Sequence, residues 1–279
     1  MKHTIHFLAG LPRSGNTLLS SILNQNPNIY SSPLSTLSTN INELDLILNS
    51  ESAVRNKENF TRGTAVLNNY AELFYSDVKK PIVFDREKNW SSPDNLNLIR
   101  KYITPDPKIV FTVRSITDIL ASCIEVKKEQ LLYSMANHNF KVKHYNSTND
   151  AICEYLMQPN GQIDNLLLSL SYAFRKVNKD NILILEYDDI VNDTQSVLKK
   201  IYNFIGEESY KHNLNNIQKI EFDNELKVGD PTNLHEVRNT ISPSKTDASS
   251  VLSDYILQKY KNANFWREDS IQKIVGRDL

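Results

Sequence analysis

Short apolar runs alternate along the chain with longer segments in which apolar residues recur every three or four positions. The short runs predict buried β-strands, and the longer segments predict amphipathic helices. Four runs stand out, at residues 4–9, 81–85, 108–114 and 181–187. Because a helical pattern follows each run, we expect parallel βαβ units and an α/β fold with one doubly wound sheet between helices.

Polar segments separate these units. Helical patterns are expected at about residues 18–23, 42–55, 61–78, 95–102, 117–132, 151–177, 194–205 and 248–262. The pattern over 151–177 is interrupted near residues 159–161. Residues 29–41 and 134–150 lack periodicity, so we expect loops there that cover the ligand site. The C-terminal quarter contains no run that predicts a strand, and its Trp266 is expected to dock on the core.

Composition narrows the class of protein. The 279 residues are 40% hydrophobic and 23% charged, as is typical of a soluble globular protein. The formal net charge of −1 creates no overall field that would attract nucleic acid or an anionic membrane. No window holds the about 20 apolar residues that a membrane span requires, and no signal peptide is evident. We therefore expect a cytoplasmic protein with no membrane span and no nucleic-acid partner.

Cysteine and histidine form no metal-binding pattern. Cys123 and Cys153 are too few for a four-ligand zinc site or a disulfide framework, and both lie in apolar helical patterns. The six histidines show neither HxH nor HExxH spacing. The sequence therefore predicts no metal site, and we interpret both cysteines as buried core thiols.

Parallel sheets of this kind bind ligands beyond the carboxyl ends of their strands. The four predicted strands end at residues 10–17, 85–88, 114 and 187–189. We expect these four places to meet at one edge of the sheet and to form a ligand site.

The first strand end is GLPRSGNT, residues 10–17, which has the glycine spacing of a phosphate loop. Its two glycines allow a tight turn and a close approach to an anion. Backbone N–H groups and the start of the next helix would point at that anion, and Arg13 would add charge. The hydroxyls of Ser14 and Thr17 would donate hydrogen bonds. An ordinary strand-to-helix turn is the alternative.

Asn16 occupies the position at which nucleotide triphosphatases carry lysine. That lysine reaches the β- and γ-phosphates, and the neighbouring hydroxyl holds magnesium. Asn16 donates hydrogen bonds without carrying charge. The loop is therefore expected to hold a single phosphate-like group, with no requirement for a metal.

Arg114 and Ser122 suggest a second anion site. Arg114 stands at the carboxyl end of a predicted buried strand, and Ser122 lies about two turns into the following helix. Alone, a strand-end arginine pairs with a carboxylate about as often as it binds a ligand. Together with the phosphate loop, it predicts a ligand with two separate anionic groups.

LPRSGNT, followed by a helix and later by VFTVRSITDILAS, resembles the sulfotransferase family that uses 3′-phosphoadenosine 5′-phosphosulfate. Three further segments are similar to that family: IVFDREKNW to its bacterial-type branch, LEYDDIVNDTQSVLKKIYNFIG to its tyrosine-acidic strand end, and NFWREDSIQKIVG to its C-terminal tail. The resemblance covers nearly the whole chain in the family's order. It implies a P-loop-like three-layer fold with a central parallel sheet, in one sulfotransferase domain over residues 1–279.

The resemblance implies sulfuryl transfer to a hydroxyl or amine of a small-molecule or glycan acceptor, with release of adenosine 3′,5′-bisphosphate. The loop would hold the 5′-phosphosulfate, and the residues of the second motif would hold the 3′-phosphate. HEVR resembles the segment that folds over the 3′-phosphate, although a solvated charged loop is the alternative there. The implied donor-binding residues are Pro12, Arg13, Ser14, Gly15, Asn16, Thr17, Arg114, Ser122, Tyr187 and Arg238.

Sulfuryl transfer needs fixed positive charge, for which Arg13 and Arg86 are the candidates. Both stand where the family often carries lysine, so we expect electrostatic clamps more than proton donors. The acceptor also needs a base, and the histidine of the cytosolic branch is not evident. Glu87 and Asp85 are the main candidates, with Asp85 alternatively orienting an arginine. His6 is a weaker one, because a histidine in a buried strand is more often packed.

Two other functions fit part of the pattern. A degenerate kinase or nucleotide triphosphatase would need an acidic magnesium ligand, which Asp85 could supply, and a substitute lysine, which the loop lacks. A catalytically inactive nucleotide-binding module is the second alternative.

Segments 30–41, 86–92 and 134–150 are candidates for the acceptor pocket, with Trp90 as one wall. Their residues do not distinguish a carbohydrate acceptor from a lipid, phenol or peptide.

Overall fold

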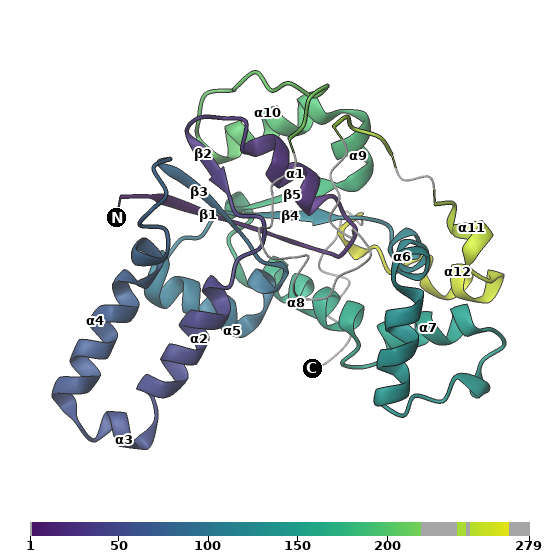
Figure 1. The fold of residues 1–279 in the computed structure, drawn as a ribbon, viewed down its shortest axis with the longest axis horizontal. Helices are drawn as coiled ribbons and strands as arrows, with labels where there is room; N and C mark the ends of the chain where they lie inside the picture. The colour runs from purple at the N-terminus through teal and green to yellow at the C-terminus, as the bar shows by residue number, and fades with distance from the viewer. Residues whose placement is uncertain (1, 219–238, 244–245, 268–279) are drawn as a thin grey trace.

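The structure is a computed structural model of the chain, and it describes residues 2–218, 239–243 and 246–267. Within these residues, one sheet of five parallel strands has the order β2-β3-β1-β4-β5 (Figure 1). The strands are β1 (Thr4–Gly10), β2 (Ile29–Ser31), β3 (Ile82–Arg86), β4 (Ile109–Val113) and β5 (Ile182–Glu186). All four strands expected from the apolar runs are present, and the α/β fold is confirmed.

The edge strand β2 lies in a segment for which the polar pattern predicts a loop. Ile29 pairs with Ile82 of β3, and Ser31 pairs with Phe84. Three residues are too few to show a period of two, so backbone pairing with β3 defines this strand. Beyond it, residues 32–36 do form a loop, and a helix starts at Leu37. The loop prediction was therefore wrong at both ends of the segment.

Helices of varied length connect the strands. They are α1 (Asn16–Leu23), α2 (Leu37–Leu48), α3 (Glu51–Val54), α4 (Lys57–Phe74), α5 (Pro93–Leu98), α6 (Ile116–Asn137), α7 (Thr148–Met157), α8 (Gln162–Lys176), α9 (Tyr187–Asn192), α10 (Thr194–Ile205), α11 (Ala248–Val251) and α12 (Asp254–Tyr260). Short 3₁₀ or π turns are η1 (Lys88–Ser91), η2 (Ile99–Ile103), η3 (Val142–His144), η4 (Lys179–Asn181) and η6 (Phe265–Arg267). The predicted break near residues 159–161 separates α7 from α8. The predicted loop 134–150 is shorter than expected, because α6 continues to Asn137 with Met135 buried.

Helices cover both faces of the sheet, which gives three layers (Figure 1). In β1, Phe7 and Ala9 belong to one buried cluster, and Leu8 belongs to the other. Helices α2, α4, α5, α6, α7 and α8 contribute to the first cluster, and α1, α9 and α10 contribute to the second. Cys123 and Cys153 are buried free thiols within the first cluster, as expected.

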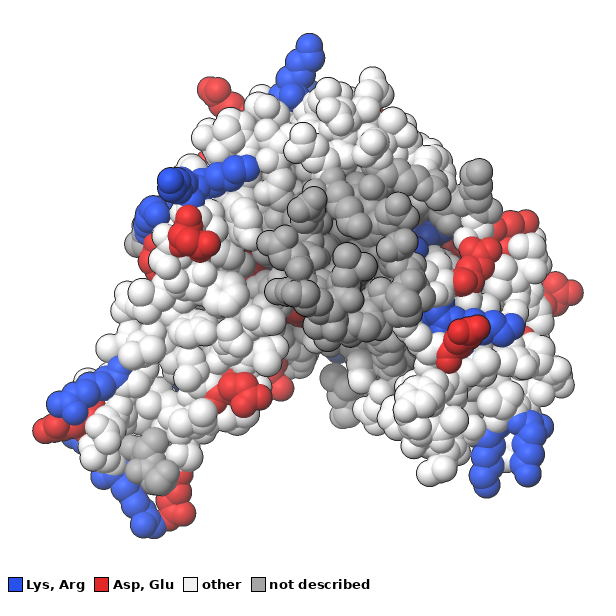
Figure 2. All heavy atoms as spheres, in the orientation of Figure 1, with Lys and Arg blue, Asp and Glu red and all other residues white. Residues whose placement is uncertain are grey.

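The helices α2, α3 and α4 project from the sheet as an arm (Figure 1). Exposed ion pairs join Arg55 to Glu51 and Arg62 to Glu58 along it. Figure 2 shows acidic and basic side chains intermixed on this face, in line with a net charge of −1. Among the described residues, no helix combines the length and apolar character needed to cross a membrane.

The strands β1 and β4 approach each other closely at the end of β1. A Cβ atom on Gly10 would lie 2.3 Å from the carbonyl oxygen of Thr112 in β4, and Gly10 has a φ of +150°. Only glycine fits this position. The direction of strand order also reverses between β1 and β4. From β1 the chain continues through α1 to β2 and β3 at one edge of the sheet, and from β4 it continues through α6 to β5 at the opposite edge. A doubly wound sheet binds its ligand at this reversal.

Substituting Gly10 tests this contact. We expect Gly10→Ala to lower the free energy of unfolding by at least about 3 kcal/mol, because the added carbon overlaps backbone atoms in a strained conformation. Gly206→Ala is the matched control: Gly206 has a φ of +80°, but a Cβ atom there would meet nothing within 4 Å. Gly206→Ala should lower the free energy of unfolding by only about 1 kcal/mol. Urea unfolding of both variants is the measurement, and equal losses would contradict a tight β1–β4 contact.

Candidate active site

The parallel strands bring their carboxyl ends to one edge of the sheet, where the predicted site residues lie. The phosphate loop follows β1, Arg86 ends β3, Arg114 follows β4 and Tyr187 follows β5. Because β3 and β4 flank β1 in the sheet, these residues form two groups, one on each side of the loop.

The loop between β1 and α1 has the shape of an anion site. Arg13 has a φ of +60° and Gly15 a φ of +90°, so the backbone turns back on itself. Helix α1 begins at Asn16, and its N-cap residue is Gly15, which has no side chain to cap the helix. The N–H groups at a helix start, together with the helix dipole, attract an anion.

The side chain of Ser14 corrects one expectation for this loop. Ser14 is fully buried, and its hydroxyl lies 2.5 Å from the carbonyl oxygen of Leu11 and 2.6 Å from the hydroxyl of Thr112. This hydroxyl therefore ties the loop to β4, and only the backbone N–H of Ser14 can serve an anion. The side chain of Asn16 also closes onto the loop, with Nδ2 3.4 Å from the Leu11 carbonyl oxygen.

Four predicted residues come together on the β4 side. Arg13 Nε donates to Ser122 Oγ at 3.1 Å, and Arg114 Nη1 donates to the carbonyl oxygen of Arg13 at 3.2 Å. The guanidinium carbon of Arg114 lies 4.3 Å from the centre of the Tyr187 ring. Arg114 is buried, and its Nε has no hydrogen-bond partner among the described residues. A buried donor without a partner is a group that a ligand can satisfy.

Arg86 and Thr17 meet on the β3 side. Arg86 Nη1 donates to Thr17 Oγ1 at 2.8 Å, and the Arg86 side chain is buried. Glu87 follows directly and accepts a hydrogen bond from the Asn89 N–H at 3.2 Å. Burial raises the pKa of the Glu87 carboxyl above its ordinary value, which increases its strength as a base. A fixed positive charge and a candidate base are thus consecutive in the chain.

Asp85 is fully buried and surrounded by donors. Its Oδ2 accepts from Ser35 Oγ at 2.6 Å and from the Tyr75 hydroxyl at 2.5 Å, while Oδ1 accepts from Trp90 Nε1 at 2.7 Å. Burial raises the pKa of Asp85 to about 6, although the three hydrogen bonds act in the opposite direction. Both carboxylate oxygens are occupied by protein donors, which is the geometry of a residue that organises its surroundings.

Trp90 corrects another expectation. It does not line an open pocket, because it is fully buried and its ring packs edge-on against Phe7 with the centroids 5.0 Å apart. Its N–H is satisfied by Asp85, as a buried indole requires. Through Ser35 and Trp90, Asp85 joins two of the three segments that were candidates for the acceptor pocket.

Three other residues were singled out in the sequence. Arg238 falls outside the described residues. His6 is buried in β1 beside Phe84, and burial lowers its pKa to about 4, as fits a packed histidine. Trp266 is buried in the core, as expected.

A sequence profile for the sulfotransferase domain matches residues 4–268. The chain belongs to the sulfotransferase family. It is a sulfotransferase, an enzyme that moves a sulfuryl group, and the resemblance carried by LPRSGNT and VFTVRSITDILAS is confirmed at the level of the family.

Solved sulfotransferase structures share the fold of this sulfotransferase. The sulfotransferase domain of the Synechococcus PCC 7002 olefin synthase is 19% identical, with 100% of this chain and 96% of that chain covered and a TM-score of 0.51. A sulfotransferase from Alicyclobacillus acidocaldarius is 13% identical, with 100% and 98% covered and a TM-score of 0.52. A mouse sulfotransferase complexed with PAP is 14% identical, with 99% and 88% covered and a TM-score of 0.51. No curated protein sequence matches the chain.

Sequence patterns missed the partners of the buried polar groups in this sulfotransferase. Ser35 is 50 residues from Asp85 in the chain, and Thr112 is 98 residues from Ser14. No local spacing marks such pairs. The available signal is a polar residue inside an apolar run, such as Thr112 in VFTV, because a buried polar group requires a partner.

Asp85→Asn tests the organising role of Asp85. The amide nitrogen cannot accept a hydrogen bond, so at least one donor loses its acceptor, and we expect the free energy of unfolding to fall by about 1–3 kcal/mol at low pH. The loss should depend on pH. Because the folded-state pKa is raised to about 6, the contribution of Asp85 is complete below about pH 4 and is lost as the pH rises through about 6.

Chemical unfolding of both proteins between about pH 4 and pH 8 is the measurement. The free energy of unfolding of the wild type should exceed that of Asp85→Asn by an amount that shrinks with rising pH, by up to about 3 kcal/mol. Asp94→Asn, at an exposed position in the first turn of α5, controls for the loss of one surface charge. A difference in free energy of unfolding that is constant or grows with pH would contradict the raised pKa of Asp85.

Proposed function

We propose that this sulfotransferase uses 3′-phosphoadenosine 5′-phosphosulfate as its donor. It would transfer the sulfuryl group to a hydroxyl or amine of a small-molecule or glycan acceptor and release adenosine 3′,5′-bisphosphate. The observation that carries the proposal is the contact between the phosphate loop and the group of Arg13, Ser122 and Arg114. These residues would provide two adjacent positions for anions, and a ribose with 5′ and 3′ groups presents two separate anions.

Each part of the donor has a suitable partner. The loop amides and the start of α1, with glycine as its N-cap residue, suit the 5′-phosphosulfate. Ser122 and the unpartnered Nε of Arg114 suit the 3′-phosphate, since charge-assisted hydrogen bonds from arginine are strong. Tyr187 offers an aromatic ring beside them. The PAP complex of the mouse sulfotransferase of the same fold supports this choice of donor.

Transfer is proposed as an in-line displacement at sulfur. The acceptor oxygen forms a bond to sulfur, the bond from sulfur to the 5′-phosphate oxygen breaks, and that phosphate oxygen keeps the electron pair. The acceptor proton passes to Glu87. Arg86, held by Thr17, and the loop amides stabilise the negative charge on the oxygens during transfer. The step requires no metal.

Glu87 is the better of the two acidic candidates for the base. Asp85 is fully buried, and both of its oxygens accept hydrogen bonds from protein donors. Glu87 keeps a small exposed fraction of 9%, and burial raises its pKa. A base must reach the acceptor proton, which a fully enclosed carboxylate cannot do.

A magnesium-dependent kinase or nucleotide triphosphatase is less well supported. It would need Asp85 as a metal ligand, and that carboxylate already accepts three hydrogen bonds inside the protein. The loop carries Asn16 in place of the lysine that reaches the β- and γ-phosphates.

Arg114→Gln tests the donor assignment. Loss of a charged donor to the 3′-phosphate should weaken the binding of adenosine 3′,5′-bisphosphate by roughly 30- to 100-fold. Binding of adenosine 5′-monophosphate should change little, because that ligand lacks the 3′-phosphate. Titration calorimetry with both nucleotides is the measurement. Wild-type protein that binds a triphosphate with magnesium in preference to the bisphosphate would favour the kinase alternative.

Glu87→Gln tests the base. Turnover of labelled donor, measured over a panel of phenols, amines and sugars, should fall by about 100- to 10,000-fold while the dissociation constant for adenosine 3′,5′-bisphosphate is retained. Asp85→Asn is the comparison variant, and a larger loss of turnover there would assign the base to Asp85. If the wild-type protein sulfates no acceptor on the panel but still binds the bisphosphate, the inactive binding module is favoured.

A further inference from the structure

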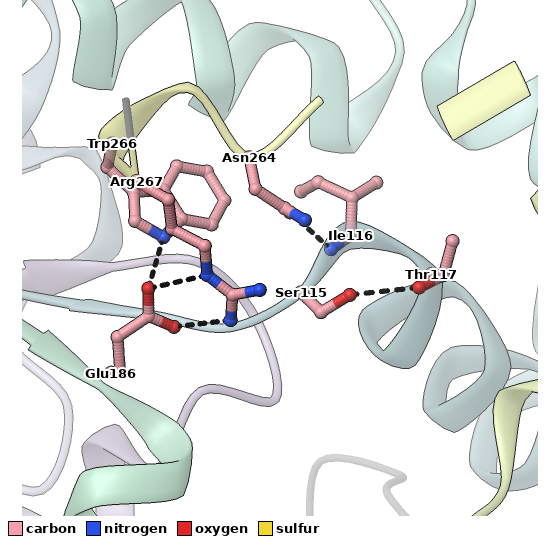
Figure 3. A network of polar contacts seen from close by, with 7 residues as sticks. All are labelled: Ser115, Ile116, Thr117, Glu186, Asn264, Trp266 and Arg267. Atoms are coloured by element: carbon pink, nitrogen blue, oxygen red, sulfur yellow. Dashed lines mark hydrogen bonds and ion pairs between the residues drawn. The ribbon is translucent and has the colours of Figure 1, made fainter. Parts of the chain in front are cut away.

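A short C-terminal segment lies across the ends of β4 and β5 (Figure 3). It contains Asn264, Trp266 and Arg267, which we call the C-terminal clasp. The clasp is anchored in the core, because Trp266 is buried and the neighbouring Phe265 packs edge-on against Phe174 with the centroids 5.8 Å apart. Its polar groups point at the sheet edge, where the donor residues lie.

On the β5 side, the clasp holds Glu186, the last residue of the strand. Trp266 Nε1 and Arg267 Nε each donate to Glu186 Oε1 at 2.8 Å, and Arg267 Nη2 donates to Oε2 at 2.8 Å (Figure 3). Both carboxylate oxygens are therefore engaged, one of them twice. A bidentate arginine–carboxylate pair fixes the orientation of the two side chains as well as their distance. The residue held in this way directly precedes Tyr187.

On the β4 side, the clasp caps α6. Asn264 Oδ1 accepts a hydrogen bond from the Ile116 N–H at 2.9 Å, at the first residue of the helix. The N-cap residue Ser115 makes no side-chain cap, and its hydroxyl pairs with Thr117 instead (Figure 3). A residue 148 positions away in the chain thus caps the helix start that directly follows Arg114.

One short segment therefore fixes the neighbours of both Arg114 and Tyr187. These two side chains contact each other, with the guanidinium carbon 4.3 Å from the ring centre. Arg114 has a buried Nε without a hydrogen-bond partner among the described residues. The direction of its side chain is set by its backbone, by that ring and by the hydrogen bond from Nη1 to the carbonyl oxygen of Arg13. Small shifts of β4 relative to β5 would turn this donor away from its ligand.

We propose that the C-terminal clasp is a positioning element for the 3′-phosphate of the donor nucleotide. It holds the ends of β4 and β5 at the spacing in which Arg114 and Tyr187 form one binding surface. The inference rests on the proposed donor, and it adds the residues Asn264, Trp266, Arg267 and Glu186 to the set that determines nucleotide selectivity. None of these four is proposed to touch the nucleotide.

The test compares two nucleotides on full-length variants. Arg267→Gln removes the bidentate ion pair with Glu186. Trp266→Phe removes one N–H donor and keeps an aromatic ring in the core. Arg267→Lys keeps the charge with fewer donors. Lys259→Gln is the matched control, because Lys259 in α12 donates to both oxygens of Glu154 in α7 at 2.7 Å, and neither residue belongs to the clasp, β4 or β5. Calorimetry gives dissociation constants for adenosine 3′,5′-bisphosphate and adenosine 5′-monophosphate.

Arg267→Gln and Trp266→Phe should each weaken binding of the bisphosphate by about tenfold, because a misplaced donor loses most of its interaction. Binding of the monophosphate should change by less than about twofold. The dissociation constant for the monophosphate divided by that for the bisphosphate should therefore fall. Arg267→Lys should give an intermediate ratio, and Lys259→Gln should leave it unchanged. A purely structural role would weaken both nucleotides alike.

The outcomes separate this inference from the proposed function. If the wild-type protein does not bind the bisphosphate, the donor assignment itself fails. If the wild-type protein binds it selectively and the clasp variants keep the same ratio, only the clasp inference is overturned. If Arg267→Gln does not fold, Trp266→Phe decides, since it keeps the aromatic packing of the segment.

Discussion

The close approach of β1 and β4 at Gly10 is the constraint on which the rest of the site depends. Without a Cβ at this position, the backbone of β1 lies against Thr112, and the Leu11 N–H at the start of the loop donates to the Thr112 carbonyl oxygen. The buried hydroxyl of Ser14 secures the loop in that position. As a result, the carbonyl oxygen of Arg13 comes within hydrogen-bond distance of Arg114, which joins the loop to the second strand end.

Charged groups are concentrated inside this edge of the sheet, and their burial has a cost. Arg86, Arg114 and Asp85 are all less than a tenth exposed. The structure offsets the cost with directed partners: Thr17 for Arg86, the Tyr187 ring and a carbonyl oxygen for Arg114, and three donors for Asp85. Groups held in this way do not have to reorganise when charge develops on a substrate, which is how fixed dipoles favour a transfer step.

The two sides of the phosphate loop have different chemistry. On the β4 side, two arginines and an aromatic ring lie together, and the C-terminal clasp contacts Glu186 at the end of β5 and the start of α6 after β4. On the β3 side, Arg86 and Glu87 place a cation and a carboxyl next to each other. In the proposed function, donor binding would depend on the β4 side of the loop and group transfer on the β3 side.

The sequence by itself determined the features that depend on near neighbours in the chain. Apolar runs located β1, β3, β4 and β5, and glycine spacing located the loop, because strand period and turn geometry are properties of a few consecutive residues. Tertiary structure alone decided what each buried polar group contacts. The hydroxyl of Ser14, the donors around Asp85 and the cap from Asn264 join residues up to 148 positions apart, and β2 exists only through pairing with β3. Such partners follow from the way the layers pack, which no local pattern encodes.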